Sequence, residues 1–156
     1  MNIFFEEHQE VIKLLLKHEV DFLLVGGYAV VYHGYRRTTG DMDLWVRPSN
    51  ENRDKLVNAL SELGFEDEDL IVLGNMDFTA HQVFTLGSEP QKIDFLTKIN
   101  QVSFEDANAD KVIAEFENML VPVINLNHLV LSKINSGRRK DEADVEELQK
   151  IQRKNK

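Results

Sequence analysis

Apolar and polar positions recur along this chain with two different periods, and this predicts a mixture of helices and strands. Apolar residues have helical spacing in residues 4–17, in residues 50–64, between Asn125 and Gly137, and in residues 141–151. Ser49 and Asn125 stand where N-caps are expected, and a short helix is expected at residues 28–34. Short apolar or alternating runs predict strands at residues 21–25, 41–46, 80–87 and 91–99.

The order of these elements predicts the fold class. Strands and helices alternate in the first half, and the sequence SEP then joins two strands as a hairpin loop. This order is typical of an α/β (α+β) protein with a mixed β-sheet flanked by helices and a C-terminal helical segment. No repeat or linker divides the chain, so we expect one domain of residues 1–156, with a core at about 20–100 and a helical part at about 105–156. We expect the chain to pass into the helix between Asn125 and Gly137 shortly after Pro122.

The charge of the chain is strongly acidic and unevenly distributed. The formal net charge is -9, and residues 138–156 are the exception, with seven basic and five acidic side chains. Proteins that bind nucleic acids without specificity neutralise phosphates with a basic surface. We therefore expect no general DNA binding, and we interpret the basic C-terminal stretch as a solvated helix of mixed charge.

Two further features bear on location and chemistry. The chain has no cysteine, which excludes disulfides, thiolate metal sites and a cysteine nucleophile. It also has no apolar run long enough to cross a bilayer, and its first residues are acidic where a signal peptide is basic. We therefore expect a cytoplasmic protein without membrane contact.

Two aspartates interrupt the apolar strand at residues 41–46. Side chains alternate along a strand, so Asp41 and Asp43 point to one face while Met42 and Leu44 point to the other. If the strand at residues 91–99 is a neighbour, Asp94 joins the pair as a third acid. Three carboxylates repel one another unless a cation lies among them, and Mg²⁺ prefers oxygen ligands. Two such ions, ~4 Å apart, would serve phosphoryl transfer.

A double glycine, Gly26 and Gly27, follows the strand at residues 21–25. Without Cβ atoms the backbone turns sharply there, and its N–H groups and the start of the next helix could meet a polyphosphate. An Asp-x-Asp or a Gly-Gly alone is common in surface loops. Their order along the chain, with a later apolar-flanked Asp94, is more specific than any one of them.

The segment LVGGYAVVYHGYRRTTGDMDLWV resembles the first motif of the nucleotidyltransferase superfamily, which has the DNA polymerase β-like fold. In that motif Gly-Gly or Gly-Ser precedes Asp-x-Asp by about a dozen residues. The strand KIDFL is similar to the site of the family's third acid. The segment VPVINLNHLVLSKINSGRRKDEADVEEL resembles the C-terminal part of small stand-alone bacterial members, including toxin-type and minimal nucleotidyltransferases.

The resemblance implies the transfer of a nucleoside monophosphate from an NTP to a hydroxyl or phosphate acceptor, with release of pyrophosphate. It implies roles for eight residues: Asp41, Asp43 and Asp94 as catalytic metal ligands, with Asp94 as ligand or base, and Gly26, Gly27, Arg37, Thr39 and Lys133 in contact with phosphates. The alternative to phosphate contact for Lys133 is a structural role, in which its side chain extends from an otherwise buried helix to solvent. For Trp45 and Tyr28, core packing is favoured over stacking on a base.

Three functions stay open at this point. The first is a Mg²⁺-dependent nucleotidyltransferase whose acceptor is a tRNA, a small molecule or a protein. The second is an inactive member of the fold that binds nucleotides or a protein, although the presence of all three acids argues against it. The third, compatible with the first, is a component of a toxin–antitoxin pair that binds a cognate antitoxin. A homodimer or other partner could complete the cleft. The choice of NTP is open.

Overall fold

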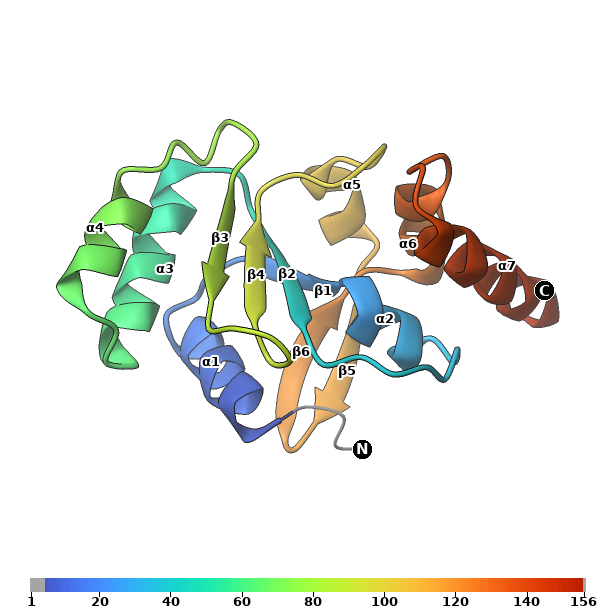
Figure 1. Ribbon diagram of the computed structural model, residues 1–156, viewed down its shortest axis with the longest axis horizontal. Coiled ribbons are helices and arrows are strands. Elements are labelled where there is room, and N and C mark those ends of the chain that lie inside the picture. Colours follow the sequence, from blue (N-terminus) through green and yellow to red (C-terminus); the bar gives the residue numbers. More distant parts are fainter. Residues whose placement is uncertain (1–4, 156) are drawn as a thin grey trace.

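The computed structural model describes residues 5–155 and contains a six-stranded mixed sheet with helices on both faces (Figure 1). The strand order is β3-β4-β2-β1-β6-β5. The strands are β1 (Phe22–Val25), β2 (Met42–Val46), β3 (Val83–Leu86), β4 (Ile93–Leu96), β5 (Val112–Phe116) and β6 (Met119–Val123). The helices are α1 (Glu6–Lys17), α2 (Gly26–Tyr32), α3 (Asn50–Glu62), α4 (Asp67–Gly74), α5 (Phe104–Ala109), α6 (Leu126–Lys133) and α7 (Arg139–Lys154).

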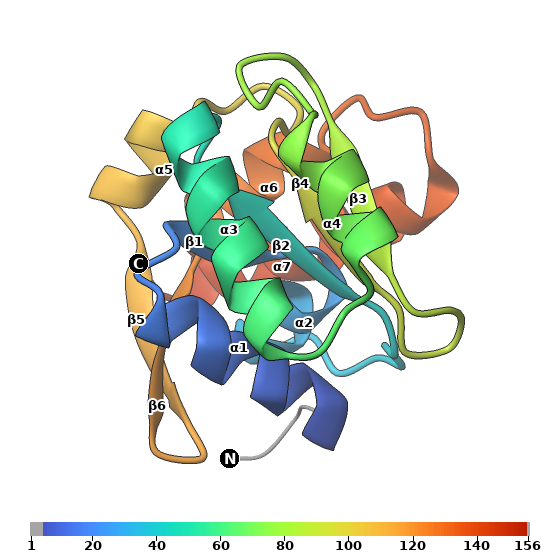
Figure 2. The same ribbon diagram turned by 90° about the vertical axis from the view of Figure 1, so that its left-hand side faces the viewer.

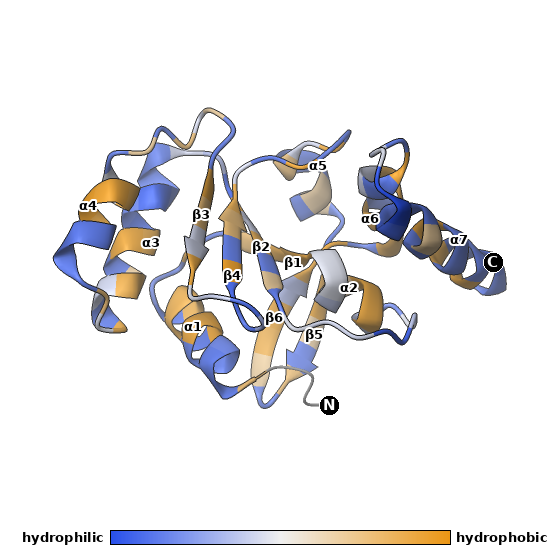
Figure 3. Ribbon diagram, in the orientation of Figure 1, coloured by the Kyte–Doolittle hydropathy of each residue, from blue (hydrophilic) through white to orange (hydrophobic). Residues whose placement is uncertain are grey.

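The helices form two layers around the sheet. Figure 2 shows α1, α3 and α4 in front of the strands, with α2, α6 and α7 behind them. The central strand β1 is buried along its whole length because helices cover both of its faces. Helix α1 buries Val11, Ile12 and Leu15, and α3 buries Leu56 and Leu60. Helix α7, in contrast, is mostly hydrophilic (Figure 3). None of the helices within residues 5–155 has the length and apolar character needed to cross a membrane.

The strand register sets the acidic residues beside one another. Strands β1 and β2 are antiparallel, whereas β2 and β4 are parallel, with Asp43 opposite Asp94 and Leu44 opposite Phe95. The condition under which Asp94 joins the pair, that these two strands are neighbours, is therefore met. Because residues that pair across neighbouring strands point to the same face, Asp43 and Asp94 emerge together.

Most predicted elements are present with small shifts at their ends. Ser49 caps α3 by accepting a hydrogen bond from the backbone N–H of Asn52, and Asn125 caps α6. Helix α2 begins at Gly26, two residues before its predicted start. Helix α6 ends at Lys133 rather than near Gly137, and α7 begins at Arg139. Phe4, the predicted start of the first helix, lies outside the described residues.

The region between β4 and α6 differs from the prediction. Residues 105–156 were expected to be helical, but they also supply β5 and β6, which extend the sheet beyond β1. Pro122 itself lies within β6, opposite Ile113 of β5, and the helix expected after it begins at Leu126. Strands β5 and β6 are joined by a turn at Glu117 and Asn118, whose φ angles are 45° and 66°. Helices α4 and α5, eight and six residues long, were not predicted.

Candidate active site

The two neighbouring strands β2 and β4 carry the candidate acids. Asp41 immediately precedes β2, and Asp43 lies on β2, with its side chain opposite in direction to the fully buried Met42 and Leu44. Asp94 lies on β4 beside Asp43. The alternation read from the sequence is therefore confirmed: the apolar side chains face the core below α1 and α3, and the acids face the other layer.

Trp45 shares the face of Asp43 but takes no part in an open site. It is 1% exposed, its indole N–H donates to the carbonyl of Thr97 at 3.1 Å, and Phe104 of α5 packs edge-on against it. Tyr28 is also 1% exposed. Core packing, the favoured interpretation for both aromatic residues, is confirmed.

The carboxylate of Asp43 is in an unfavourable electrostatic environment. Its pKa is raised from the usual 3.8 to about 6, first by burial, then by the negative charge of Asp94, and also by that of Asp41. Lys133 and Lys140 oppose this rise. The acids crowd one another, and this repulsion is what a bound cation would relieve.

The other two aspartates have different partners. Asp94 accepts a hydrogen bond from the Thr85 hydroxyl at 2.5 Å and lies 3.6 Å from the ammonium of Lys92. The Oδ1 atom of Asp41 is buried and has no hydrogen-bond partner within residues 5–155. In that part of the chain no three His, Cys, Asp or Glu side chains already form a metal-binding group. The unpartnered oxygen and the raised pKa of Asp43 nevertheless fit a hard divalent ion such as Mg²⁺.

The double glycine packs directly against the acids and the loop before them. Gly26 has a φ of +66°, and a Cβ placed there would overlap the carboxylate of Asp43, whose Cγ would lie only 2.9 Å away. A Cβ at Gly27 would lie 3.1 Å from the Cβ of Thr39 and 3.3 Å from Nη1 of Arg37. The structure therefore brings Gly26 to Asp43, and Gly27 to Thr39 and Arg37.

We expect Gly26→Ala to reduce both stability and any activity of this site. The positive φ costs a residue with a Cβ about 1–3 kcal/mol, and the new methyl group would displace the Asp43 carboxylate. Urea denaturation would measure the loss of unfolding free energy. Gly64→Ala is the matched control, since its φ is +93° and nothing lies within 4 Å of the added Cβ. If both variants lose the same stability and Gly26→Ala keeps full function, the contact with Asp43 has no importance.

A cavity of about 260 Å³ lies between Asp43 and the C-terminal helices. Gly26 and Asp43 line it on the sheet side, and Ser132, Lys133 and Arg138 line it on the helical side. Lys133 is thus placed across the cavity from Asp43, although the two are 90 residues apart in the sequence. The cavity has a negative wall on the sheet and a positive wall on the helices.

The two cations predicted to contact phosphates are held by aspartates of α7. The Lys133 ammonium lies 3.1 Å from Asp141 and 3.0 Å from Asp144. Arg37 lies 2.9 Å from Asp144 through Nε and 3.0 Å through Nη2. Burial opposes ionisation of Asp141, but hydrogen bonds from Ser136, Lys133 and Arg138 and the Lys133 charge leave its pKa lowered.

Sequence reasoning missed Asp144 and gave Asp141 no role at the site. Both side chains are 1–2% exposed, which is rare for aspartate unless it is paired. A signal was present: Asp141, Asp144 and Leu148 follow one another at i, i+3 and i+7, so the acids share a face with a core leucine.

A family described as "Nucleotidyl transferase of unknown function (DUF2204)" matches residues 4–156. The chain belongs to this family. No curated protein matches this sequence. Its fold is nucleotidyltransferase-like, as predicted.

Solved structures with the same fold include three nucleotidyltransferases. The lincosamide antibiotic adenylyltransferase LnuA, with lincomycin bound, has a TM-score of 0.58 and 17% identity, over 97% of this chain and 99% of that one. A putative nucleotidyltransferase from Thermotoga maritima has a TM-score of 0.58 and 16% identity, over 98% and 97%. The enzyme ANT(2")-Ia, in complex with adenylyl-2"-tobramycin, has a TM-score of 0.55 and 11% identity, over 94% and 91%.

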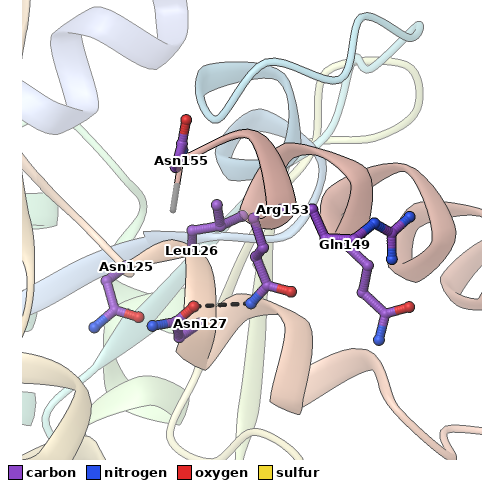
Figure 4. A pocket seen from close by; sticks show the side chains of 7 residues that line it. Asn125, Leu126, Asn127, Gln149, Arg153 and Asn155 are labelled. Atoms are coloured by element: carbon purple, nitrogen blue, oxygen red, sulfur yellow. Dashed lines mark hydrogen bonds between the residues drawn. The ribbon is translucent and has the colours of Figure 1, made fainter.

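A larger groove of about 750 Å³ lies between the start of α6 and the end of α7, away from Lys133 (Figure 4). It is lined mainly by carboxamides, and the side chain of Gln152 donates to Asn127 at 2.8 Å. Arg153 and Asn155 also line it (Figure 4). None of the predicted site residues lines it, so the smaller cavity beside Asp43 is the candidate active site.

Proposed function

We propose that the protein is a metal-dependent nucleotidyltransferase that moves a nucleoside monophosphate from an NTP to an acceptor and releases pyrophosphate. The observation that carries this proposal is the position of Asp43. It stands in register with Asp94 on a parallel neighbour, packs against the backbone of Gly26, and faces Lys133 across a cavity. This arrangement combines oxygen ligands for a cation with a cationic wall for phosphates in one small space.

Asp41, Asp43 and Asp94 are the residues that would hold Mg²⁺. The bound ion would supply Lewis-acid stabilisation of the charge that develops on the phosphoryl oxygens. Asp94, which lies 3.6 Å from the Lys92 ammonium, would serve as a metal ligand or as the acceptor of the proton from an attacking hydroxyl.

The remaining predicted residues are suited to holding the phosphates of the NTP. Thr39 and Arg37 lie against Gly27, and Lys133, which shares the Asp144 carboxylate with Arg37, lines the cavity that contains Asp43. A guanidinium and an ammonium held side by side in this way would bind the triphosphate and help to hold the α-phosphorus in line with the acceptor. Preorganised positive charge of this kind also stabilises the leaving pyrophosphate.

The acceptor proposed for the first test is a hydroxyl group of a small molecule. Two proteins with this fold are named as an antibiotic adenylyltransferase with lincomycin bound and as an enzyme in complex with adenylyl-2"-tobramycin. Those names also make ATP the first donor to test. The acidic charge of the chain, -9 overall, disfavours a long contact with a tRNA acceptor.

The test is a label-transfer assay. The purified protein is incubated with Mg²⁺ and each α-labelled NTP, and it is offered lincosamides and aminoglycosides, pooled tRNA, or a lysate as a source of protein acceptors. Label on one pool, absent with the Asp41→Asn/Asp43→Asn double variant and with EDTA, would support the proposal and identify the acceptor class. Label that persists in the double variant would contradict it. A protein that binds Mg·NTP by calorimetry but never transfers label would be the inactive nucleotide-binding alternative.

A further inference from the structure

Four side chains from three separate segments form a buried charge network behind the candidate site. Asp141 and Asp144 come from α7, Lys133 from the end of α6, and Arg37 from the loop between α2 and β2. The exposed fractions of the side chains of Lys133, Asp141 and Asp144 are 9%, 2% and 1%, and that of Arg37 is 13%. We call these four residues the Asp144 network, because Asp144 is the member that contacts both cations from outside α7.

We propose that Asp144 is a positioning residue that fixes Arg37 and Lys133 together as a phosphate-binding pair. This inference rests on the proposed function, since it concerns polyphosphate binding at the same site. Asp144 itself lies behind the cations and reaches the nucleotide only through them.

The geometry at Arg37 supports this role. Asp144 lies along one edge of the guanidinium: Nη2 donates a hydrogen bond to it at 3.0 Å, and Nε lies 2.9 Å from its other oxygen as an ion-pair contact without hydrogen-bond geometry. The remaining nitrogen, Nη1, donates to the carbonyl of Thr38 at 3.3 Å and lies 3.3 Å from the position that a Cβ on Gly27 would take. Arg37 is thus held on one edge by Asp144, and its other edge adjoins the double glycine.

The geometry at Lys133 completes the pair. The Lys133 ammonium donates a hydrogen bond to Asp141 at 3.1 Å and forms an ion pair with Asp144 at 3.0 Å. Its position is therefore defined by two contacts, while it also lines the cavity that contains Asp43. A single carboxylate, Asp144, places the two cations of separate segments at a fixed distance from each other and from the acids of β2.

Stability alone is a weak explanation for such a network. A buried set of paired charges commonly adds little net stability compared with apolar side chains of the same size, because desolvation offsets the attraction between the charges. A network that instead fixes two cations beside a polyphosphate site has a function that apolar residues could not supply. This explanation and a merely structural one differ in how a variant binds anions.

The experiment measures binding of Mg·ATP, and of inorganic tripolyphosphate, to the full chain by calorimetry. In Asp144→Asn the loss of a negative charge would by itself strengthen anion binding, whereas loss of positioning would weaken it. We expect the dissociation constant of the folded variant to rise by about tenfold or more for both probes. Arg37→Lys keeps the charge but loses the two-contact geometry, and we expect a similar rise. The double variant should be no weaker than either single variant, because both changes disrupt one arrangement.

Asp21→Asn is the matched control. It also removes an aspartate that pairs with an arginine, since Asp21 lies 2.7 Å from Arg47, but this pair is outside the candidate site, so binding should be unchanged. Unchanged or tighter binding in Asp144→Asn, or additive effects in the double variant, would overturn the inference. If Asp144→Asn does not fold, Arg37→Lys decides the question by the same criterion. The two proposals can be contradicted separately. If the wild type transfers label and Asp144→Asn binds both probes normally, only the role of Asp144 is contradicted. If the wild type binds neither probe, the proposed function and the role of Asp144 are both contradicted.

Discussion

Asp43→Asn is expected to abolish nucleotidyl transfer and, at neutral pH, to make the protein more stable. The variant removes a central metal-binding carboxylate, so the rate should fall by about 10³-fold or more. The gain in stability has a separate cause. The pKa of Asp43 in the folded protein is raised from 3.8 to about 6, which costs about 3 kcal/mol of unfolding free energy once the group is ionised.

The pH dependence of this gain has a definite sign. Below pH 3.8 the carboxyl is protonated in both folded and unfolded chains, so wild type and variant should have the same stability. As the pH rises through the range from 3.8 to about 6, the unfolded chain loses this proton first, and the wild type loses stability relative to the variant. Thermal melts in Mg²⁺-free buffer from pH 4 to 8 would measure the difference. Added Mg²⁺ should stabilise the wild type more than the variant.

A variant that is inactive and also less stable at pH 7.5 than the wild type would contradict this account, because it would mean that Asp43 stabilises the fold. Asp77→Asn is a suitable control. Asp77 is an acid exposed to solvent, and its pKa is lowered by hydrogen bonds from Thr79 and Asn50. Its replacement should therefore change stability in the opposite direction to that of Asp43 at neutral pH.

Lys133→Met is expected to cause the largest loss of stability of any single change near the site. It removes the cation that lies between Asp141 and Asp144, both almost fully buried, and leaves their charges only partly compensated by Arg138 and Arg37. Breaking a buried ion pair by removal of one partner costs about 3–5 kcal/mol. Chemical denaturation at pH 7 would measure this loss of unfolding free energy.

Lys17→Met is the control of matched chemistry, because Lys17 pairs with Glu62 at 2.7 Å but has a side chain that is 63% exposed. Exposed pairs contribute about 0–1 kcal/mol, so the two lysine variants should differ clearly. Equal losses in the two variants would mean that the network is not a buried one in solution.

The sequence was most informative where local pattern and chemistry agree. Strand β2 shows this, since the alternation of Met42 and Leu44 with Asp41 and Asp43 predicted both the strand and the face of the acids. The parallel pairing with β4 could be proposed only as a condition, because no local pattern specifies which strands are neighbours. The register that sets Asp43 against Asp94 is a property of the assembled sheet.

The parts that escaped prediction have weak local signals. The β5–β6 hairpin turns through Glu117 and Asn118, both with positive φ, without the glycine that usually marks such a turn. Pro122 argues against a strand because it lacks an N–H, yet β6 accommodates it. Asp144 was missed because its partners, Arg37 and Lys133, come from two other segments, and ion pairs of this kind appear only when the chain is folded.

The position of β1 has a consequence for how the chain is made. This central strand, Phe22–Val25, pairs with β2 along one edge and with β6 along the other, where Leu24 lies opposite Val123. Almost a hundred residues must therefore emerge from the ribosome before the second edge finds its partner. Until then the nascent chain has an apolar strand with free backbone donors and acceptors, which is a template for intermolecular pairing. Synthesis of this small protein thus includes a period of aggregation risk that ends only when its last strand arrives.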